Sequence, residues 1–349
     1  MKTDSSSLIS TALIAALLVS ACDNAAKKAD LASTQTAPAA QSASASSAPP
    51  IAEAAADDAG TTPHKAPAAS VVDESAFAGA RPTSAKSIGH TSVVFKIDFS
   101  NGQRAAWKPR SKRGKTRYKG EVAAYRLAQA LGLPNVPPAF SFRLAKEDLN
   151  KATQGKDSAL LDEEAIVETD GTVRGALIPW IPKLEFFPIE SEKSRAEWEP
   201  WLFKGADVPE KDRSLASDIS TLIAFDLITG NWDRWSGANV GAPGPSGHLL
   251  YIDNDGAFFD PVPPGPLARQ TAVLMRTERF SKSFVDSLRK LDSDALTRAL
   301  GDDSSGAGSR EPLLPASVLK GVLSRRATVL TAIDKKIAAL GESAVLYFP

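Results

Sequence analysis

The sequence predicts an α+β protein with two lobes: a strand-rich lobe that carries one helix, followed by a mainly helical lobe. Segments with the period-two alternation of strands lie before residue 180, and long patterns with helical periodicity begin at residue 215. The first 84 residues show neither pattern, which leaves 265 residues, enough to bury a sizeable core. Because strands come first and helices later, we assign residues 85–180 to the first lobe and 181–349 to the second.

The N-terminus has the features of a bacterial lipoprotein signal, which we assign to residues 1–21. Residues 8–21 form an apolar run of 14, too short to span a bilayer but suited to a signal peptide. Val19-Ser20-Ala21-Cys22 resembles a lipobox, which implies cleavage before Cys22 and acylation of that residue. A plain secretory signal is the alternative. We expect a membrane-anchored protein that faces the periplasm or the cell exterior.

Residues 22–84 are rich in Ala, Ser, Pro and Thr and have few large apolar side chains. Such a composition does not bury enough apolar surface to offset the entropy cost of ordering. We therefore expect a disordered tether between the membrane and the folded part.

The overall composition excludes several classes of function. The chain has 41 basic and 41 acidic residues, so its net charge of zero argues against a nucleic-acid partner. It has one cysteine and three widely separated histidines, which argue against a disulfide framework and a zinc site. No G-x-S-x-G, H-E-x-x-H or G-x-G-x-x-G motif is present.

In the first lobe, residues 91–99 alternate apolar and polar side chains, Asn101-Gly102 is a hairpin turn signal, and residues 103–108 resume as a strand. A helix is expected over 121–131, since Gly132 and Pro134 follow it. Further strands are expected at 139–144, 165–169 and 172–179, the last two joined by a turn at Asp170-Gly171.

In the second lobe, residues 215–229 form an amphipathic helix that ends at Gly230, and residues 249–252 form a short apolar strand. Helices are expected at 281–300 and 316–340. The segment from residue 181 to about 211 shows no clear strand or helix periodicity.

Two charged residues of the first lobe are placed where each needs a partner. Lys108 ends a half-buried strand. Glu121 lies on the same helical stripe as Ala124 and Leu131, so we expect its carboxylate to point inward. Together they suit an ion pair that presents the ammonium to a phosphate. A snorkelling lysine and a glutamate favoured by the helix dipole are the alternatives.

Two loops of the second lobe each supply an aspartate. Asp233 lies in a polar loop that also holds Asn239, and Asp253 ends the strand 249–252. This set suits a hydroxyl nucleophile oriented by Asp233 and a divalent metal held by Asp253 with Asn239. The alternative is that both aspartates only cap turns.

Asp226 lies at a helix C-terminus, where the dipole disfavours a carboxylate. We interpret it as a residue that holds the Asp233 loop through Arg234 or backbone amides. A solvated aspartate is the alternative.

These residues carry a family resemblance over about residues 87 to 260. The motifs are, in chain order, Ala106-Trp107-Lys108-Pro109, Gly120-Glu121-Val122-Ala123-Ala124, Asn231-Trp232-Asp233-Arg234 and Ile252-Asp253-Asn254. Their order resembles the atypical protein-kinase-like superfamily, most closely the Golgi casein kinase family of secreted kinases, and more loosely HipA-type and phosphoinositide kinases. In those families, as in this chain at Asp233-Arg234, the catalytic loop contains the dipeptide Asp-Arg.

The resemblance implies a bilobal kinase-like fold that uses ATP with Mg²⁺ or Mn²⁺. It implies that Lys108 contacts the ATP phosphates and pairs with Glu121, that Asp233 is the catalytic base and that Asp253 binds the metal. Asn239 departs from the family pattern, because it follows Asp233 by six positions and not five. The segment 87–91, at the place of the glycine-rich loop, holds one glycine.

The predicted function is transfer of the ATP γ-phosphoryl group to a protein or glycan hydroxyl by a membrane-anchored lipoprotein. Two alternatives stay open: a catalytically degenerate kinase-like scaffold or binding module, and AMP transfer on the same fold.

Two other patterns in the first lobe carry less weight. Gly114-Lys115-Thr116 mimics the end of a P-loop, but Pro109 stands where the first glycine would be and has no N–H for a phosphate. Residues 108–119 hold seven Lys or Arg in 12 positions, which suits either an acidic ligand or a solvated loop.

Overall fold

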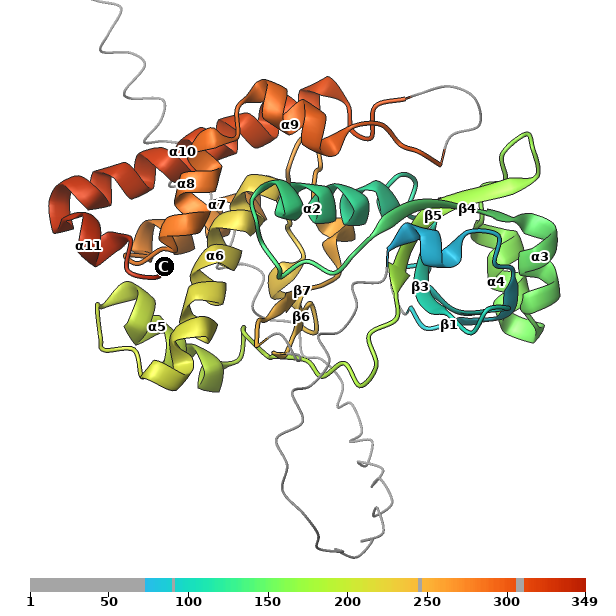
Figure 1. Ribbon diagram of the computed structural model, residues 1–349, viewed down its shortest axis with the longest axis horizontal. Helices are drawn as coiled ribbons and strands as arrows, with labels where there is room; N and C mark the ends of the chain where they lie inside the picture. The colour runs from blue at the N-terminus through green and yellow to red at the C-terminus, as the bar shows by residue number, and fades with distance from the viewer. Residues whose placement is uncertain (1–72, 90–91, 244–246, 306–310) are drawn as a thin grey trace, which may run out of the picture. The chain divides into compact units, whose positions relative to one another are not determined.

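A five-stranded antiparallel sheet, in the order β1-β2-β3-β5-β4, forms the first lobe (Figure 1). Its strands are β1 (Pro82–Ser87), β2 (Phe95–Phe99), β3 (Arg104–Pro109), β4 (Phe140–Ala145) and β5 (Thr172–Pro179). This computed structural model describes residues 73–89, 92–243, 247–305 and 311–349. These residues lie within one compact unit.

One face of the sheet forms an apolar core of its own. Phe95 and Ile97 are alternate residues of β2, and both side chains point into this core. Trp107 of β3 is paired with Phe95. Helices α3 (Lys146–Ala152) and α4 (Gly155–Glu164) add Leu149 and Leu161 to this core. Because successive side chains of a strand point to opposite faces, Lys108 projects away from this core, toward the helical lobe.

The second lobe is built mainly of helices, with a short ribbon of two strands, β6 and β7 (Figure 1). Its helices and strands are α5 (Glu192–Phe203), α6 (Arg213–Thr229), α7 (Pro264–Arg276), α8 (Lys282–Lys290), α9 (Ser293–Leu300), α10 (Ala316–Leu340), α11 (Glu342–Val345), β6 (Val240–Gly241) and β7 (Leu250–Tyr251). Its 3₁₀ turns are η2 (Glu210–Asp212), η3 (Arg234–Ser236) and η4 (Asn254–Gly256), whereas η1 (Glu74–Phe77) belongs to the first lobe. Every residue of α6 from Asp218 to Thr229 is buried, so this helix is the centre of the lobe.

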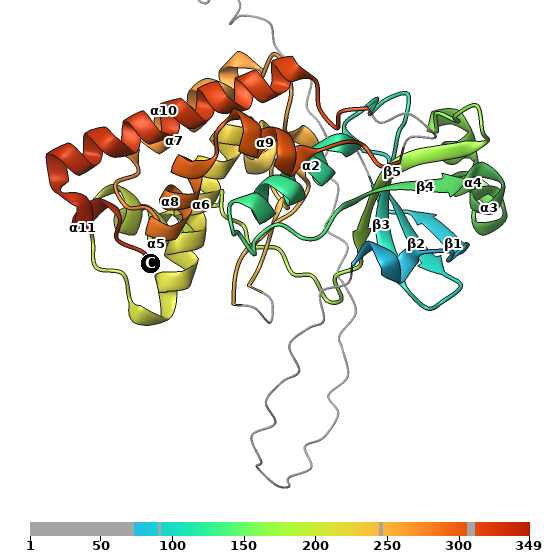
Figure 2. The same cartoon turned by 45° about the horizontal axis from the view of Figure 1, so that its top comes forward.

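Helix α2 (Tyr118–Ala130) lies between the sheet and the helical lobe (Figure 2). Its buried side chains, Val122 and Leu127 among them, belong to the same apolar core as α6 and α9. The sheet core contains no residue of α2 among the described residues. The helix therefore comes from the first lobe in sequence but packs mainly as part of the second.

The predicted α+β class is confirmed, as are the long helices at α2, α6 and α10. The predicted tether was too long, because β1 begins at Pro82 and the Phe77 ring is fully buried. The helix expected at 281–300 is two helices, because Asp292 caps α9 by accepting a hydrogen bond from the Ala295 N–H. The strand expected at 165–169 was wrong: Ala165 and Val167 make only isolated bridges.

The predicted signal peptide at 1–21, Cys22 and the tether over 22–72 lie outside the described residues, as do residues 90 and 91 of the segment 87–91. Among the described residues, no helix is long and apolar enough to cross a membrane.

Candidate functional site

Lys108 is the centre of the candidate site. Its Nζ lies 2.5 Å from Glu121 Oε1 and 2.5 Å from Asp253 Oδ1. The predicted pair between Lys108 and Glu121 is therefore present, and residues 132 positions apart in the sequence meet at one ammonium group. The side chains of Lys108 and Glu121 are almost fully buried, whereas that of Asp253 is 40% exposed. Asp253 is thus the member of the cluster that a ligand can reach.

The carboxylates around Lys108 determine its charge state. Burial lowers the pKa of Lys108, but the charges of Glu121, Asp253 and Asp255 outweigh burial, so the net effect raises the pKa and keeps the ammonium charged. Burial raises the pKa of Glu121 more than the Lys108 charge lowers it. Burial also acts to raise the pKa of Asp253, and Lys108 overrides it, so this pKa lies below its ordinary value.

Asp255 is a member of the cluster that sequence reasoning missed. Its carboxylate accepts hydrogen bonds from Arg117 Nη2 at 2.5 Å and Ser92 Oγ at 3.0 Å, and it lies 3.4 Å from Lys108 Nζ. Asn-Asp-Gly is an ordinary turn sequence, which is why the pattern alone does not single out Asp255. The alternation of acids in Asp253-Asn254-Asp255 was the available signal.

The local backbone explains how one short turn supplies so many site groups. Asp253 has a left-handed conformation (φ 55°) and directs the chain into η4. Asn254 then donates its backbone N–H to Glu121 Oε1 at 3.0 Å. Gly256 lies against the Asp233 loop, where an added Cβ would approach Asp233 Cβ to 2.9 Å. This glycine therefore allows the two aspartate-bearing loops to meet.

Asp233 lies in this second loop and is partly exposed. Its backbone N–H donates to Asn231 Oδ1 at 3.3 Å, and its carbonyl accepts from Asn239 Nδ2 at 2.7 Å. In the part of the chain that the structure describes, its carboxylate accepts no hydrogen bond and forms no ion pair. The backbone of Asp233 is thus fixed by two hydrogen bonds, and its carboxylate has no protein partner among the described residues.

Asp226 and Arg234 form a fully buried ion pair beneath the two loops. Arg234 Nε lies 3.1 Å from Asp226 Oδ2, and Arg234 also donates to the carbonyls of Asn239 and Ile252 and to Asn254 Oδ1. The expected link from Asp226 through Arg234 is present, and Asp226 is not solvated. Burial raises the pKa of Asp226 to about 6, although Arg234 opposes the shift. The guanidinium joins α6, the Asp233 loop and the Asp253 turn.

Asn239 is buried in the same loop. Its Nδ2 donates to the Asp233 carbonyl and, at 3.1 Å, to Ser236 Oγ. Its side-chain nitrogen thus closes the loop around Asp233, which leaves only Oδ1 for the metal that we predict it to bind.

The basic segment 108–119 is largely neutralised by the fold. Five of its seven cations have acidic partners: Lys108, Arg110, Arg113, Arg117 and Lys119. Residues 114–116 do not form a P-loop, because the Gly114 N–H donates to Ser111 Oγ at 2.9 Å and is not available for a phosphate. Arg110 and Arg113 pair within the first lobe, whereas Lys108 and Arg117 pair with aspartates of the second.

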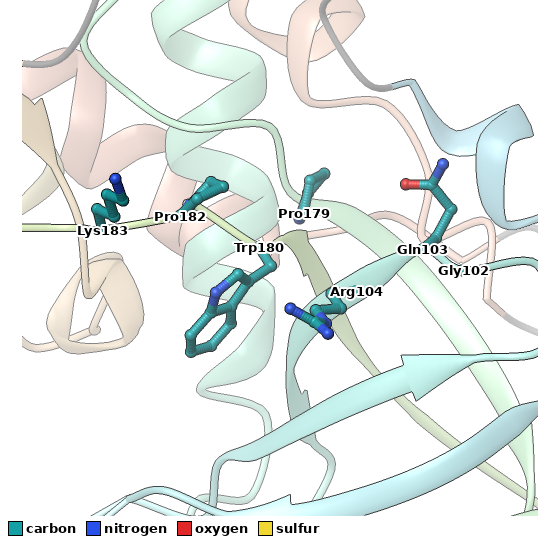
Figure 3. A pocket seen from close by; sticks show the side chains of 7 residues that line it. All are labelled: Gly102, Gln103, Arg104, Pro179, Trp180, Pro182 and Lys183. Atoms are coloured by element: carbon teal, nitrogen blue, oxygen red, sulfur yellow. The ribbon is translucent and has the colours of Figure 1, made fainter. Parts of the chain in front are cut away.

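A pocket of about 360 Å³ lies at the other end of β3, where the chain passes from β5 to the helical lobe (Figure 3). Arg104, Pro179, Trp180 and Lys183 line it. Arg104 is four residues before Lys108, so about 13 Å of strand separates the two positions.

The cluster can accommodate a hard divalent cation. Glu121, Asp253 and Asp255 bring three carboxyl groups together with the side chains of Lys108 and Arg117. Within the described ranges, no group of three or more His, Cys, Asp or Glu side chains has the arrangement of a metal site. Mg²⁺ commonly takes one or two carboxylates and completes its shell with substrate phosphates. The donors present fit that mode, with Asp253 as the accessible ligand.

Solved structures share this fold. The crystal structure of the Golgi casein kinase with Mn/ADP bound matches at a TM-score of 0.57 and 16% identity, covering 76% of each chain. The Golgi casein kinase matches in a further crystal structure at 0.54 and 15%, covering 75% of this chain and 74% of that one. Hydra Fam20 with sugar matches at 0.54 and 18%, covering 78% and 90%. The chain therefore has the atypical kinase-like fold that the sequence predicted.

No protein-family model matches the sequence, and no curated protein matches it.

Proposed function

We propose that the protein is an ATP-dependent phosphotransferase that uses Mg²⁺ or Mn²⁺ to move the γ-phosphoryl group to a protein or glycan hydroxyl. The observation that carries the proposal is the contact of Lys108 with both Glu121 and Asp253, which brings together a strand, a helix and a loop at one charged group. The Mn/ADP bound to the Golgi casein kinase supports the choice of ligands.

In this proposal each side chain has a separate task. Lys108 binds phosphate oxygens, and Glu121 orients its ammonium. Asp253, with Asn239 as a second ligand, would hold the divalent cation, which would supply positive charge near the phosphates. Asp233 accepts the proton of the acceptor hydroxyl as the oxygen–phosphorus bond forms and the bond to ADP breaks. Asp226 and Arg234 keep the Asp233 and Asp253 loops at a fixed separation.

We also propose that acylation of Cys22 anchors the protein to a membrane, facing the periplasm or the cell exterior. The support is the lipobox around the sole cysteine of the chain. Labelled palmitate incorporation that is lost in Cys22→Ser tests the anchor.

The test of ligand binding is a thermal-shift titration of the protein with ATP and Mn²⁺. Ligand at about 100 times its Kd stabilises the folded state by about 2.7 kcal/mol. We expect this shift in the parent and in Asp334→Ala, a control that removes a half-exposed carboxylate of α10. We expect Asp253→Ala to lose most of it, because the accessible metal ligand is gone.

Three outcomes separate the candidate functions. No shift in the parent would contradict the proposal and favour a scaffold with a degenerate site. A shift that Asp253→Ala retains in full would contradict the assigned metal ligand. Label that reaches an acceptor from α-labelled but not γ-labelled ATP would replace phosphoryl transfer by AMP transfer.

A further inference from the structure

The N-terminal turn of α2 carries Glu121 and has no side-chain cap. Its N-cap residue, Arg117, has helical dihedral angles and makes no side-chain capping hydrogen bond. The Lys119 and Gly120 N–H groups donate instead to the carbonyls of Thr116 and Arg117, each at 2.9 Å. Tertiary contacts of this turn then determine where the Glu121 side chain lies relative to Lys108.

A buried side-chain pair supplies such a contact one turn before Glu121. The Tyr118 hydroxyl donates to Asp303 Oδ2 at 2.8 Å, and the Asp303 side chain is fully buried. The other oxygen of Asp303 accepts from the Ser305 N–H at 3.0 Å and from Ser305 Oγ at 2.5 Å. Burial and the Asp303 charge raise the pKa of Tyr118, so the phenol stays protonated and keeps donating.

Neighbouring residues of α2 reach the same part of the helical lobe. Lys119 Nζ lies 3.6 Å from Asp303 Oδ2 and 3.0 Å from Glu311 Oε1. Arg126 Nη1 donates to the carbonyls of Leu300 and, at 2.7 Å, Asp302. The end of α9 and the described parts of the α9–α10 connection, residues 301–305 and 311–315, thus contact α2 through Leu300, Asp302, Asp303 and Glu311.

Close packing leaves α2 little freedom on its other side. An added Cβ at Gly120 would approach the Asn254 carbonyl oxygen to 2.6 Å, so the helix lies directly on η4. The turn that carries Glu121 is therefore held between η4 and Asp303, and both belong to the helical lobe.

We infer that Tyr118 and Asp303 form an anchor that positions Glu121 for Lys108. Both are positioning residues, since neither contacts Lys108. The helix that bears Glu121 is fixed to the helical lobe, and Lys108 contacts Glu121 from the sheet. The part of this inference that concerns phosphoryl transfer rests on the proposed function, whereas the part that concerns the order of α2 does not.

The experiment compares Tyr118→Phe with Tyr125→Phe in the full chain. Tyr125 is on the same helix, and its hydroxyl accepts a hydrogen bond from Gln129 Nε2 within that helix, so the control removes a hydroxyl without touching the anchor. Native-state hydrogen exchange is measured for the amides of residues 118–124, with the buried centre of α6 as internal reference. Asp303→Asn serves as the second variant.

We expect exchange of residues 118–124 to rise about tenfold in Tyr118→Phe, the effect of one hydrogen bond to a charged group, with α6 unchanged. Asp303→Asn should act in the same direction and Tyr125→Phe should not. We expect kcat to fall about tenfold in Tyr118→Phe, with KM for ATP changing less, because Lys108 keeps Asp253 and Asp255.

Equal exchange in Tyr118→Phe and Tyr125→Phe would overturn the anchor, and so would a rise in which α6 matches α2, because the pair would then serve only global stability. Hydrogen exchange needs no nucleotide, so it tests the anchor even if the parent transfers no phosphoryl group. Faster hydrogen exchange of residues 118–124 in Tyr118→Phe with an unchanged kcat would overturn the positioning role.

Discussion

We expect Asp233→Asn to lower phosphoryl transfer by roughly 10²- to 10⁴-fold, the usual contribution of a positioned general base. The partly exposed Asp233 carboxylate has no partner among the described residues, so it is free to take a proton. Asparagine has nearly the same shape but does not accept that proton. The measurement is single-turnover transfer from γ-labelled ATP.

The same variant should bind ATP and Mn²⁺ as the parent does, because Lys108 and Asp253 are unchanged. Asp207→Asn, which alters an exposed aspartate after α5, is the matched control and should leave transfer unaffected. Full activity in Asp233→Asn would remove Asp233 from the role of base. Loss of metal-dependent binding would assign it to the metal.

The second large effect is on stability: Arg234→Met should lower the free energy of unfolding by about 3–5 kcal/mol, the cost of breaking a buried ion pair. The change leaves the Asp226 carboxylate buried without its guanidinium and leaves three acceptors in two loops without their donor. Urea denaturation measures the change. Arg269→Met, at an exposed position of α7, should stay within about 0.5 kcal/mol of the parent.

A double variant and pH distinguish this mechanism from general damage to the loop. Asp226→Leu combined with Arg234→Met removes both charges and should recover part of the lost stability. The folded-state pKa of Asp226, about 6, exceeds the unfolded value of about 3.9, so its contribution to stability falls as pH rises from about 4 to about 6. Without Arg234 this pKa is higher still.

The difference in the free energy of unfolding between the parent and Arg234→Met should therefore become smaller as pH falls from 7 to 5. The reason is that a protonated, neutral Asp226 does not need the Arg234 guanidinium as a partner. A gap that widens on acidification would contradict the assignment of the cost to the Asp226 charge.

The elements that sequence reasoning predicted well are those whose own pattern determines them. Helix α10 has its expected bounds because helical periodicity runs through all of residues 316–340. Strand β1 was missed because its burial pattern does not alternate, as it would in a strand with one regular buried face. Helices α3 and α4 were missed because they are short and only a few of their residues are buried.

The residues of the candidate site likewise fall into those that the sequence indicated and those that it did not. Lys108 and Glu121 were found because a charge on an apolar pattern implies a partner. Asp255, Arg117 and Asp303 occur in segments that look like ordinary polar turns, and only tertiary structure brings them into contact. For Arg117 and Asp303, no pattern in the sequence indicates these contacts.

The place of α2 also limits how the chain can be divided. Residue 180 separates a strand-rich stretch from a helical one, but the apolar side of α2 is buried against helices that lie beyond it. A fragment that ends at residue 180 would expose the apolar side of α2 to water and aggregate. A fragment that begins at residue 181 would lack the α2 side chains that fill the core of the helical lobe. The two halves are thus one autonomous folding unit, and calorimetry should register a single cooperative melting transition.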